Sequence, residues 1–262
     1  MSLSSTALVT GASSGIGAAY ARRLAARGHD LILVARRAER LEQLAAELIS
    51  SYGISARPLV ADLATDDGIT RVAEVLASDT SIDMLVNNAG LTHIGGTAEL
   101  SSEGISTMLS LNVSALTRLT HAALPGFIAR NRGTIINISS VLAFQALPLS
   151  SIYAGTKAFV LLFTSGLQQE LKDTPIQVQA VLPAGVATEI YDGSIMPLDQ
   201  IPAELIMSAD TMVDAAMAGL DSGEDVTLPS VADIELWHRY AATSQALFAA
   251  SQTGSPAPRY RV

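Results

Sequence analysis

The sequence predicts an α/β fold, in which one doubly wound parallel sheet carries helices on both faces within a single domain over residues 1–262. Two observations support this prediction. Short β-branched and apolar runs alternate with longer helical segments, which implies right-handed crossovers between parallel strands. The chain also has no internal repeat, low-complexity tract or linker that would divide its 262 residues.

Strands are expected at residues 6–10, 30–35, 56–61, 82–87, 133–139, 176–182 and 225–228. Helices are expected between them, at residues 16–26, 38–51, 67–77, 102–131, 153–172 and 208–221. Pro58 falls in the third strand, and proline is tolerated on an edge strand but not on a central one. We therefore favour the strand order 3-2-1-4-5-6, in which the third strand forms an edge.

The composition argues against several classes of protein. Hydrophobic residues make up 49% of the chain, enough for a large core. No run approaches about 18 apolar residues, and the N-terminus has no basic and apolar leader, so we expect no spanning helix, no signal peptide and a cytoplasmic location. The chain has no cysteine, and its four histidines lack metal-ligand spacing, so no metal is expected. A net charge of -9 disfavours nucleic acid and membrane as partners.

The first strand, Ala7-Leu8-Val9-Thr10, leads into a glycine-rich turn and then a helix. Glycines in such a turn permit a tight bend and let the backbone approach a pyrophosphate closely at the helix N-terminus. An ordinary glycine-containing loop is the alternative, which the strand before and the helix after disfavour. We expect a dinucleotide to bind at the turn residues Gly11, Ser13, Ser14, Gly15, Ile16 and Gly17.

The second strand ends in two arginines, Arg36 and Arg37. An NAD site places a carboxylate here for the ribose 2′-hydroxyl, whereas arginine suits a 2′-phosphate. The first acid, Glu39, falls on the following helix. The pattern favours NADP over NAD as cofactor, and a solvated helix start is the alternative interpretation.

Tyr153 and Lys157 are four residues apart, so on a helix they share one face. An ammonium there would lower the tyrosine pKa from about 10, making the phenol a proton donor and acceptor for an alcohol or carbonyl oxygen. Together with the glycine-rich turn, this pair indicates hydride transfer.

Five motifs in order resemble the single-domain branch of the short-chain dehydrogenase/reductase family, which has a Rossmann fold. These are Thr10–Gly17, Asn87-Asn88-Ala89-Gly90, Asn112, Ser140 and Tyr153–Lys157. The resemblance extends from about residue 3 to residue 188. The family's usual spacing of thirteen positions before the tyrosine selects Ser140 over Ser139.

The resemblance implies the catalytic roles. Tyr153 would be the general acid in carbonyl reduction and the base in alcohol oxidation. Lys157 would hold the nicotinamide ribose and lower the Tyr153 pKa. Ser140 would hydrogen-bond the substrate oxygen, and Asn112 would hold a water that links Lys157 to solvent.

The resemblance also implies further cofactor contacts. Asp62 and Leu63 would lie at the adenine, with Asp62 accepting from its amino group. The other contacts would come from Asn88, Ala89 and Gly90 beside the cofactor and from Val186 and Thr188 near the nicotinamide. The chain departs from the family in one place, because Ala184 stands where a glycine usually follows Pro183.

The segment of about 189–224 is expected to cover a small-molecule substrate. From Glu189 to His238 there is no Lys or Arg, against eleven Asp and Glu, which disfavours a phosphorylated or coenzyme A substrate. Its apolar residues suit a neutral, apolar carbonyl or secondary alcohol, although they could instead pack a connecting helix. They are Tyr191, Ile195, Met196, Leu198, Ile201, Leu205 and Met207.

The expected helix 153–172 contains five consecutive apolar residues, Phe159–Phe163, which cover all of its sides. One side of this helix can pack on the sheet, and the other needs a second chain or a covering element. We expect a homo-oligomer (dimer or tetramer) through this helix and helix 102–131. A non-catalytic dinucleotide-binding sensor on the same fold is the alternative function, and the complete Ser140, Tyr153 and Lys157 set argues against it.

Overall fold

A computed structural model describes residues 5–191 and 198–260. The chain divides into two compact units, Met1–Pro229 and Ser230–Val262. The first unit holds one seven-stranded sheet, in which every pair of neighbouring strands is parallel. Its strands are β1 (Thr6–Thr10), β2 (Asp30–Ala35), β3 (Ala56–Val60), β4 (Ile82–Asn87), β5 (Thr134–Ile138), β6 (Gln177–Val181) and β9 (Val226–Thr227).

The strand order is β3-β2-β1-β4-β5-β6-β9, and β3 with Pro58 forms one edge. The predicted doubly wound α/β fold is therefore confirmed. The register of the strands shows that β1, β2, β4 and β5 all end at one edge of the sheet. The turns that follow these strands meet there, which is where parallel sheets of this kind bind ligands.

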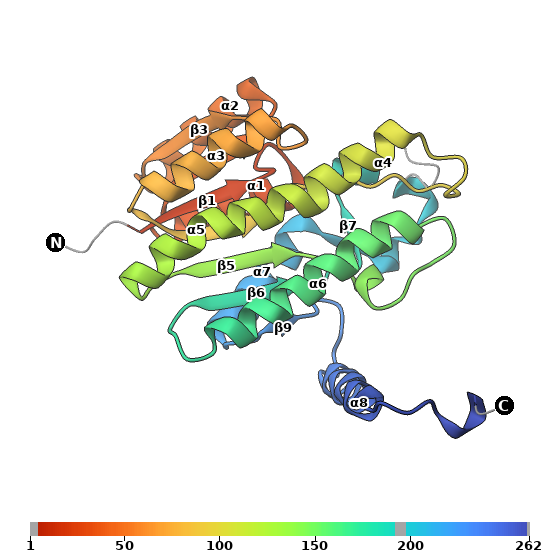
Figure 1. The fold of residues 1–262 in the computed structure, drawn as a ribbon. Helices are drawn as coiled ribbons and strands as arrows, with labels where there is room; N and C mark the ends of the chain where they lie inside the picture. The colour runs from red at the N-terminus through yellow and green to blue at the C-terminus, as the bar shows by residue number, and fades with distance from the viewer. Residues whose placement is uncertain (1–4, 192–197, 261–262) are drawn as a thin grey trace. The chain divides into compact units, whose positions relative to one another are not determined.

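Helices cover both faces of the sheet (Figure 1). They are α1 (Gly15–Ala26), α2 (Ala38–Tyr52), α3 (Asp66–Ser78), α4 (Ser102–Leu109), α5 (Leu116–Arg130), α6 (Ser151–Leu171) and α7 (Ala209–Asp221). One apolar core joins the sheet to α1, α2 and α7, with Tyr20 and Leu24 fully buried in it. The other joins the opposite face to α3, α5 and α6, around Ile69 and Phe127.

The single helix expected over 102–131 is not continuous α-helix. A π-helical stretch, η1 (Ser110–Ala115), separates α4 from α5. Asn112 lies in this stretch, and its side chain bonds the backbone of Leu91 outside the helix. Isolated π-helical turns often occur at functional sites, and propensity alone did not predict this one.

A buried polar cluster links β4, β5 and the helices behind them. Asn87 donates to the Asn137 side-chain oxygen at 2.9 Å and to Thr120 at 3.0 Å. Asn137 donates onward to Thr164 of α6 at 3.0 Å. Asn87 therefore braces the sheet, while Asn88 enters the site.

Two strands in the first unit and one α-helix in the second were also not predicted. The strands β7 (Gly185–Ala187) and β8 (Ile206–Ser208) form a small parallel sheet beyond β6. In the second unit, α8 (Glu235–Ser251) has no buried residue. No helix in the described ranges is long and apolar enough to cross a membrane.

Candidate active site

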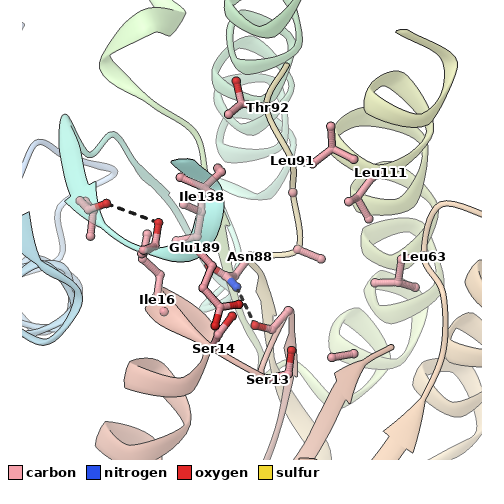
Figure 2. A pocket seen from close by; sticks show the side chains of 18 of the residues that line it. Ser13, Ser14, Ile16, Leu63, Asn88, Leu91, Thr92, Leu111, Ile138 and Glu189 are labelled. Atoms are coloured by element: carbon pink, nitrogen blue, oxygen red, sulfur yellow. Dashed lines mark hydrogen bonds between the residues drawn. The ribbon is translucent and has the colours of Figure 1, made fainter. Parts of the chain in front are cut away.

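A cavity of about 470 Å³ opens where β1, β2, β4 and β5 end (Figure 2). It gathers residues from the glycine-rich turn, from the end of β4, from α6 and from the segment after β6. Every site residue predicted from the sequence lines this cavity except Gly17 and Asn112.

The glycine-rich turn is shaped by close backbone contacts. Gly11 has φ +67°, and a Cβ there would lie 2.6 Å from the side-chain amide nitrogen (Nδ2) of Asn88. A Cβ at Gly17 would overlap the Gly11 carbonyl, so Gly17 packs beneath the turn instead of lining the cavity. Thr10, which was not predicted, accepts from the Asn88 and Ala89 amides at 2.9 and 3.0 Å. The hydroxyl of Thr10 thus ties the turn to the end of β4.

The start of α1 is suited to an anion. Ser14 is its N-cap and makes no side-chain capping bond, and the first turn contains no acid. Backbone amides at a helix N-terminus attract phosphate. Gly15 (φ +53°) allows Thr188 to approach, since a Cβ there would lie 2.9 Å from the Thr188 methyl. The turn therefore fits a dinucleotide pyrophosphate.

Tyr153, Lys157 and Ser140 meet at the opposite end of the cavity. The Lys157 ammonium is buried, lies 5.7 Å from the centre of the Tyr153 ring and donates to the Ile138 carbonyl at 2.9 Å. Ser140 caps the turn after β5 and hydrogen-bonds Tyr153. Ser139 is buried and donates instead to the Lys157 carbonyl at 2.8 Å, so only Ser140 presents its hydroxyl beside Tyr153.

The two titratable groups are both shifted by burial. Burial lowers the pKa of Lys157 to about 8. Burial also raises the pKa of Tyr153 above its usual value; the neighbouring Tyr191 adds to the rise, and the Ser140 hydrogen bond opposes it. The expected lowering of the Tyr153 pKa by Lys157 is therefore not found in this structure. The physical reason is that burial disfavours the charged phenolate, while the Lys157 ammonium donates to the Ile138 carbonyl and lies 5.7 Å from the centre of the Tyr153 ring.

Asn112 does not line the cavity but holds one of its walls. Its side chain accepts from the Leu91 amide and donates to the Leu91 carbonyl, both at 2.9 Å, and also donates to Thr156 at 3.1 Å. A Cβ on Gly90 would lie 3.2 Å from the Asn112 oxygen and 3.7 Å from the Lys157 ammonium. Asn112 thus lies near Lys157 and joins the irregular segment that follows β4 to α6.

The two arginines after β2 differ in their contacts. Arg37 donates to Ser13 and Ser14 and pairs with Glu189 at 2.6 Å. Arg40, which was not predicted, also pairs with Glu189. Arg36 lines the cavity and has no ion pair or hydrogen bond within the described part of the chain. Arg36 is therefore the arginine more available to a 2′-phosphate.

The remaining predicted positions also line the cavity. Asp62 lines the cavity, and one of its carboxylate oxygens accepts from the Ala64 amide at 3.0 Å. Val186 lies on β7, and Thr188 follows it. Ala184 is not among the non-glycine residues with positive φ, so this backbone carries no left-handed strain. In the described ranges, no group of three or more His, Asp or Glu could hold a metal ion.

The family model of the short chain dehydrogenases matches residues 5–195. The chain belongs to this family. The predicted family and enzyme class are therefore confirmed. A relative from Anas platyrhynchos, a very-long-chain 3-oxoacyl-CoA reductase, is 35% identical over 87% of this chain and 73% of its own.

Two solved short-chain dehydrogenases cover 98% of this chain. One, from Sphingobium yanoikuyae in complex with NADPH, is 43% identical over all of its own chain with a TM-score of 0.95. The other, a bulky-bulky ketone specific alcohol dehydrogenase from Comamonas testosteroni, is 38% identical over 99% of its chain with a TM-score of 0.91.

The substrate side of this short-chain dehydrogenase differs in detail from expectation. Among the described apolar residues of the segment 189–224, Tyr191 lines the cavity, whereas Met207 packs against the core and Leu205 is exposed. Ile195 and Met196 lie outside the described residues.

The acids of this region are also less free than the sequence indicated. Asp210 and Asp214 pair with Arg23 of α1, and Asp221 pairs with Arg27. Together with the pairing of Glu189, this leaves less uncompensated negative charge than the sequence implies, so charge alone is a weak argument about the substrate.

Proposed function

We propose that the protein is an NADP(H)-dependent oxidoreductase that interconverts a carbonyl compound and a secondary alcohol, with Tyr153 as acid and base. The observation that carries this proposal is the placement of two sites in one cavity. The cavity is lined by the glycine-rich turn and Arg36 as well as by Tyr153 and Ser140. The NADPH complex of the Sphingobium relative supports the choice of cofactor.

Each of the four catalytic residues would have a separate role in the reaction. The bound nicotinamide would supply or accept the hydride. Ser140 would donate a hydrogen bond to the substrate oxygen, and Tyr153 would transfer a proton to that oxygen during reduction. Lys157 would hold the charge of the tyrosinate that remains, and Asn112 would keep Leu91 and α6 in place around it.

We propose a neutral, apolar and bulky substrate. The loop between Ser140 and Tyr153 exposes three large apolar side chains, Phe144, Leu147 and Leu149, and burying such surface contributes about 25 cal/mol per Å². The ketone specificity named for the Comamonas relative favours this class. The 3-oxoacyl-CoA reductases favour a second candidate, a coenzyme A thioester with a long acyl chain.

We expect a bulky neutral ketone to be reduced with a kcat/KM at least about tenfold above that of a 3-oxoacyl-CoA carrying a similar apolar body. The reason is that a coenzyme A thioester brings several phosphates, whereas the described residues 188–191 and 198–238 offer no Lys or Arg to receive them. The measurement is NADPH consumption with both compounds at two salt concentrations. A preference for the thioester that fades as salt rises would support the second candidate instead.

We expect the rate of carbonyl reduction to fall as the pH rises through about 8. Since the pKa of Lys157 is lowered to about 8, its ammonium is present below that pH and lost above it. Without the ammonium, the developing tyrosinate loses its nearest positive charge. The test is kcat/KM for reduction at saturating NADPH from about pH 6 to 10. A profile that stays flat through about pH 9.5 would contradict this role of Lys157.

We also propose a homo-oligomer, either dimer or tetramer, formed through α6 and α5. On α6, Leu162 is 76% exposed and Phe159 is 40% exposed, and on α5 Ile128 is 52% exposed. These side chains would be buried against a second copy. Light scattering checks this proposal, and the molar mass of a single chain would contradict it.

A further inference from the structure

Glu189 lines the cavity described above and forms two ion pairs. Its carboxylate pairs with Arg37 at 2.6 Å and with Arg40 of α2 at 2.5 Å. All three side chains remain open to solvent, at 41%, 41% and 47% exposure. These pairs hold the pKa of Glu189 near 2, so the carboxylate is ionised at any physiological pH.

The Glu189 carboxylate lies beside the glycine-rich turn. Arg37 also donates to Ser13 and Ser14 of the phosphate-binding turn. Ser14 adds a further hydrogen bond to Glu189. Figure 2 shows Glu189 reaching down to Ser14, across the entrance of the turn. The Glu189 carboxylate therefore already binds the guanidinium groups of Arg37 and Arg40 and the Ser14 hydroxyl. We expect a phosphate of the dinucleotide to bind at the same place.

We propose that Glu189 is an internal competitor for the cofactor phosphate: its carboxylate holds Arg37 and Arg40 until a phosphate of the dinucleotide displaces it. This inference rests on the proposed function. Exposed ion pairs contribute little to stability, so the Glu189 pairs are weak enough to exchange. A phosphate offers more charge and more acceptor oxygens than a carboxylate, and arginine binds it bidentately.

The exchange has a consequence at the other end of the cavity. Glu189 opens the short helix η3 (Glu189–Tyr191), and Tyr191 lines the same cavity as Tyr153. Binding of the phosphate would free the segment that brings Tyr191 to the catalytic tyrosine. Glu189 is thus a positioning residue that links cofactor binding to the substrate end of the site.

The test is the variant Glu189→Gln, which keeps the size of an exposed side chain and removes its charge. Dissociation constants for NADPH and NADH are measured by calorimetry without substrate. We expect Glu189→Gln to bind NADPH roughly 2- to 30-fold more tightly than the unmutated protein, the range that two exposed ion pairs allow. Glu42→Gln is the matched control, because it removes an equal charge from an exposed position of α2.

The two dinucleotides identify which phosphate competes. Tighter binding of NADPH alone would assign the competition to the 2′-phosphate, and tighter binding of both would assign it to the pyrophosphate. Unchanged or weaker NADPH binding in Glu189→Gln, or an equal gain in Glu42→Gln, would overturn the inference while leaving the proposed function standing. If the unmutated protein bound neither dinucleotide, the proposed function would fail first, and the inference with it.

Discussion

Replacing Tyr153 with phenylalanine is expected to lower kcat for carbonyl reduction by about 10²–10⁴-fold, with folding and dinucleotide binding intact. The ring keeps its place on α6 beside the Lys157 ammonium, so the change removes only the hydroxyl. Turnover is followed by NADPH absorbance, cofactor binding by calorimetry, and folding by circular dichroism.

Two variants serve as controls for the tyrosine. Tyr52→Phe removes an exposed hydroxyl at the end of α2, and activity should not change. Ser140→Ala should lower kcat with little change in cofactor affinity, because Ser140 contacts Tyr153 and not the glycine-rich turn. If Tyr153→Phe kept more than about a tenth of the activity, another group would be the general acid.

The second large effect is expected at Arg36. Arg36→Asp should weaken NADPH binding by roughly 10- to 150-fold and leave NADH binding unchanged or tighter. One charge-assisted hydrogen bond to a phosphate contributes about 1.5–3 kcal/mol, and an aspartate would repel that phosphate while accepting from a ribose hydroxyl. Dissociation constants for both dinucleotides are the measurement.

Arg57→Ala is the control for this experiment, because Arg57 lies on the neighbouring strand β3 and pairs with Asp79 away from the cavity. It should change neither constant. Arg37→Ala should cost less NADPH affinity than Arg36→Asp, since Arg37 already bonds Ser13, Ser14 and Glu189. Equal affinity of the unmutated protein for NADPH and NADH would contradict the assignment of Arg36.

The sequence was sufficient wherever a feature depends on neighbours along the chain. Ala7–Val9 is apolar and precedes a glycine, so β1 and the turn could be predicted together. Tyr153 and Lys157 share a helix face because they are four positions apart. Pro58 identified the edge strand because a single missing amide proton is incompatible with a central position.

Features that depend on distant partners could not be predicted in this way. The side chains of Glu189 and Arg37 meet across 152 positions of sequence, and neither residue belongs to a shared local pattern. The π-helical stretch around Asn112 depends on the backbone of Leu91, which approaches from another element. The direction of the Tyr153 pKa shift likewise depends on burial and on the Ile138 carbonyl that engages Lys157.

Helix α8 escaped prediction for a different reason. Apolar periodicity marks a helix when one face is buried against a core. None of the residues of α8 is buried, and its side chains show no such division into two faces.

The asparagine pair Asn87 and Asn137 sets the alignment of two strands that carry opposite halves of the chemistry. β4 continues into Asn88 beside the glycine-rich turn, and β5 continues into Ser140 beside Tyr153. A slip of two residues along β5 would move Ser140 by about 7 Å and leave the Asn87 amide without its partner in the core. Each buried polar group left unsatisfied costs about 1–3 kcal/mol. The Asn87–Asn137 pair therefore favours this one alignment of β4 and β5. A misaligned sheet would move Ser140 and Tyr153 away from the glycine-rich turn.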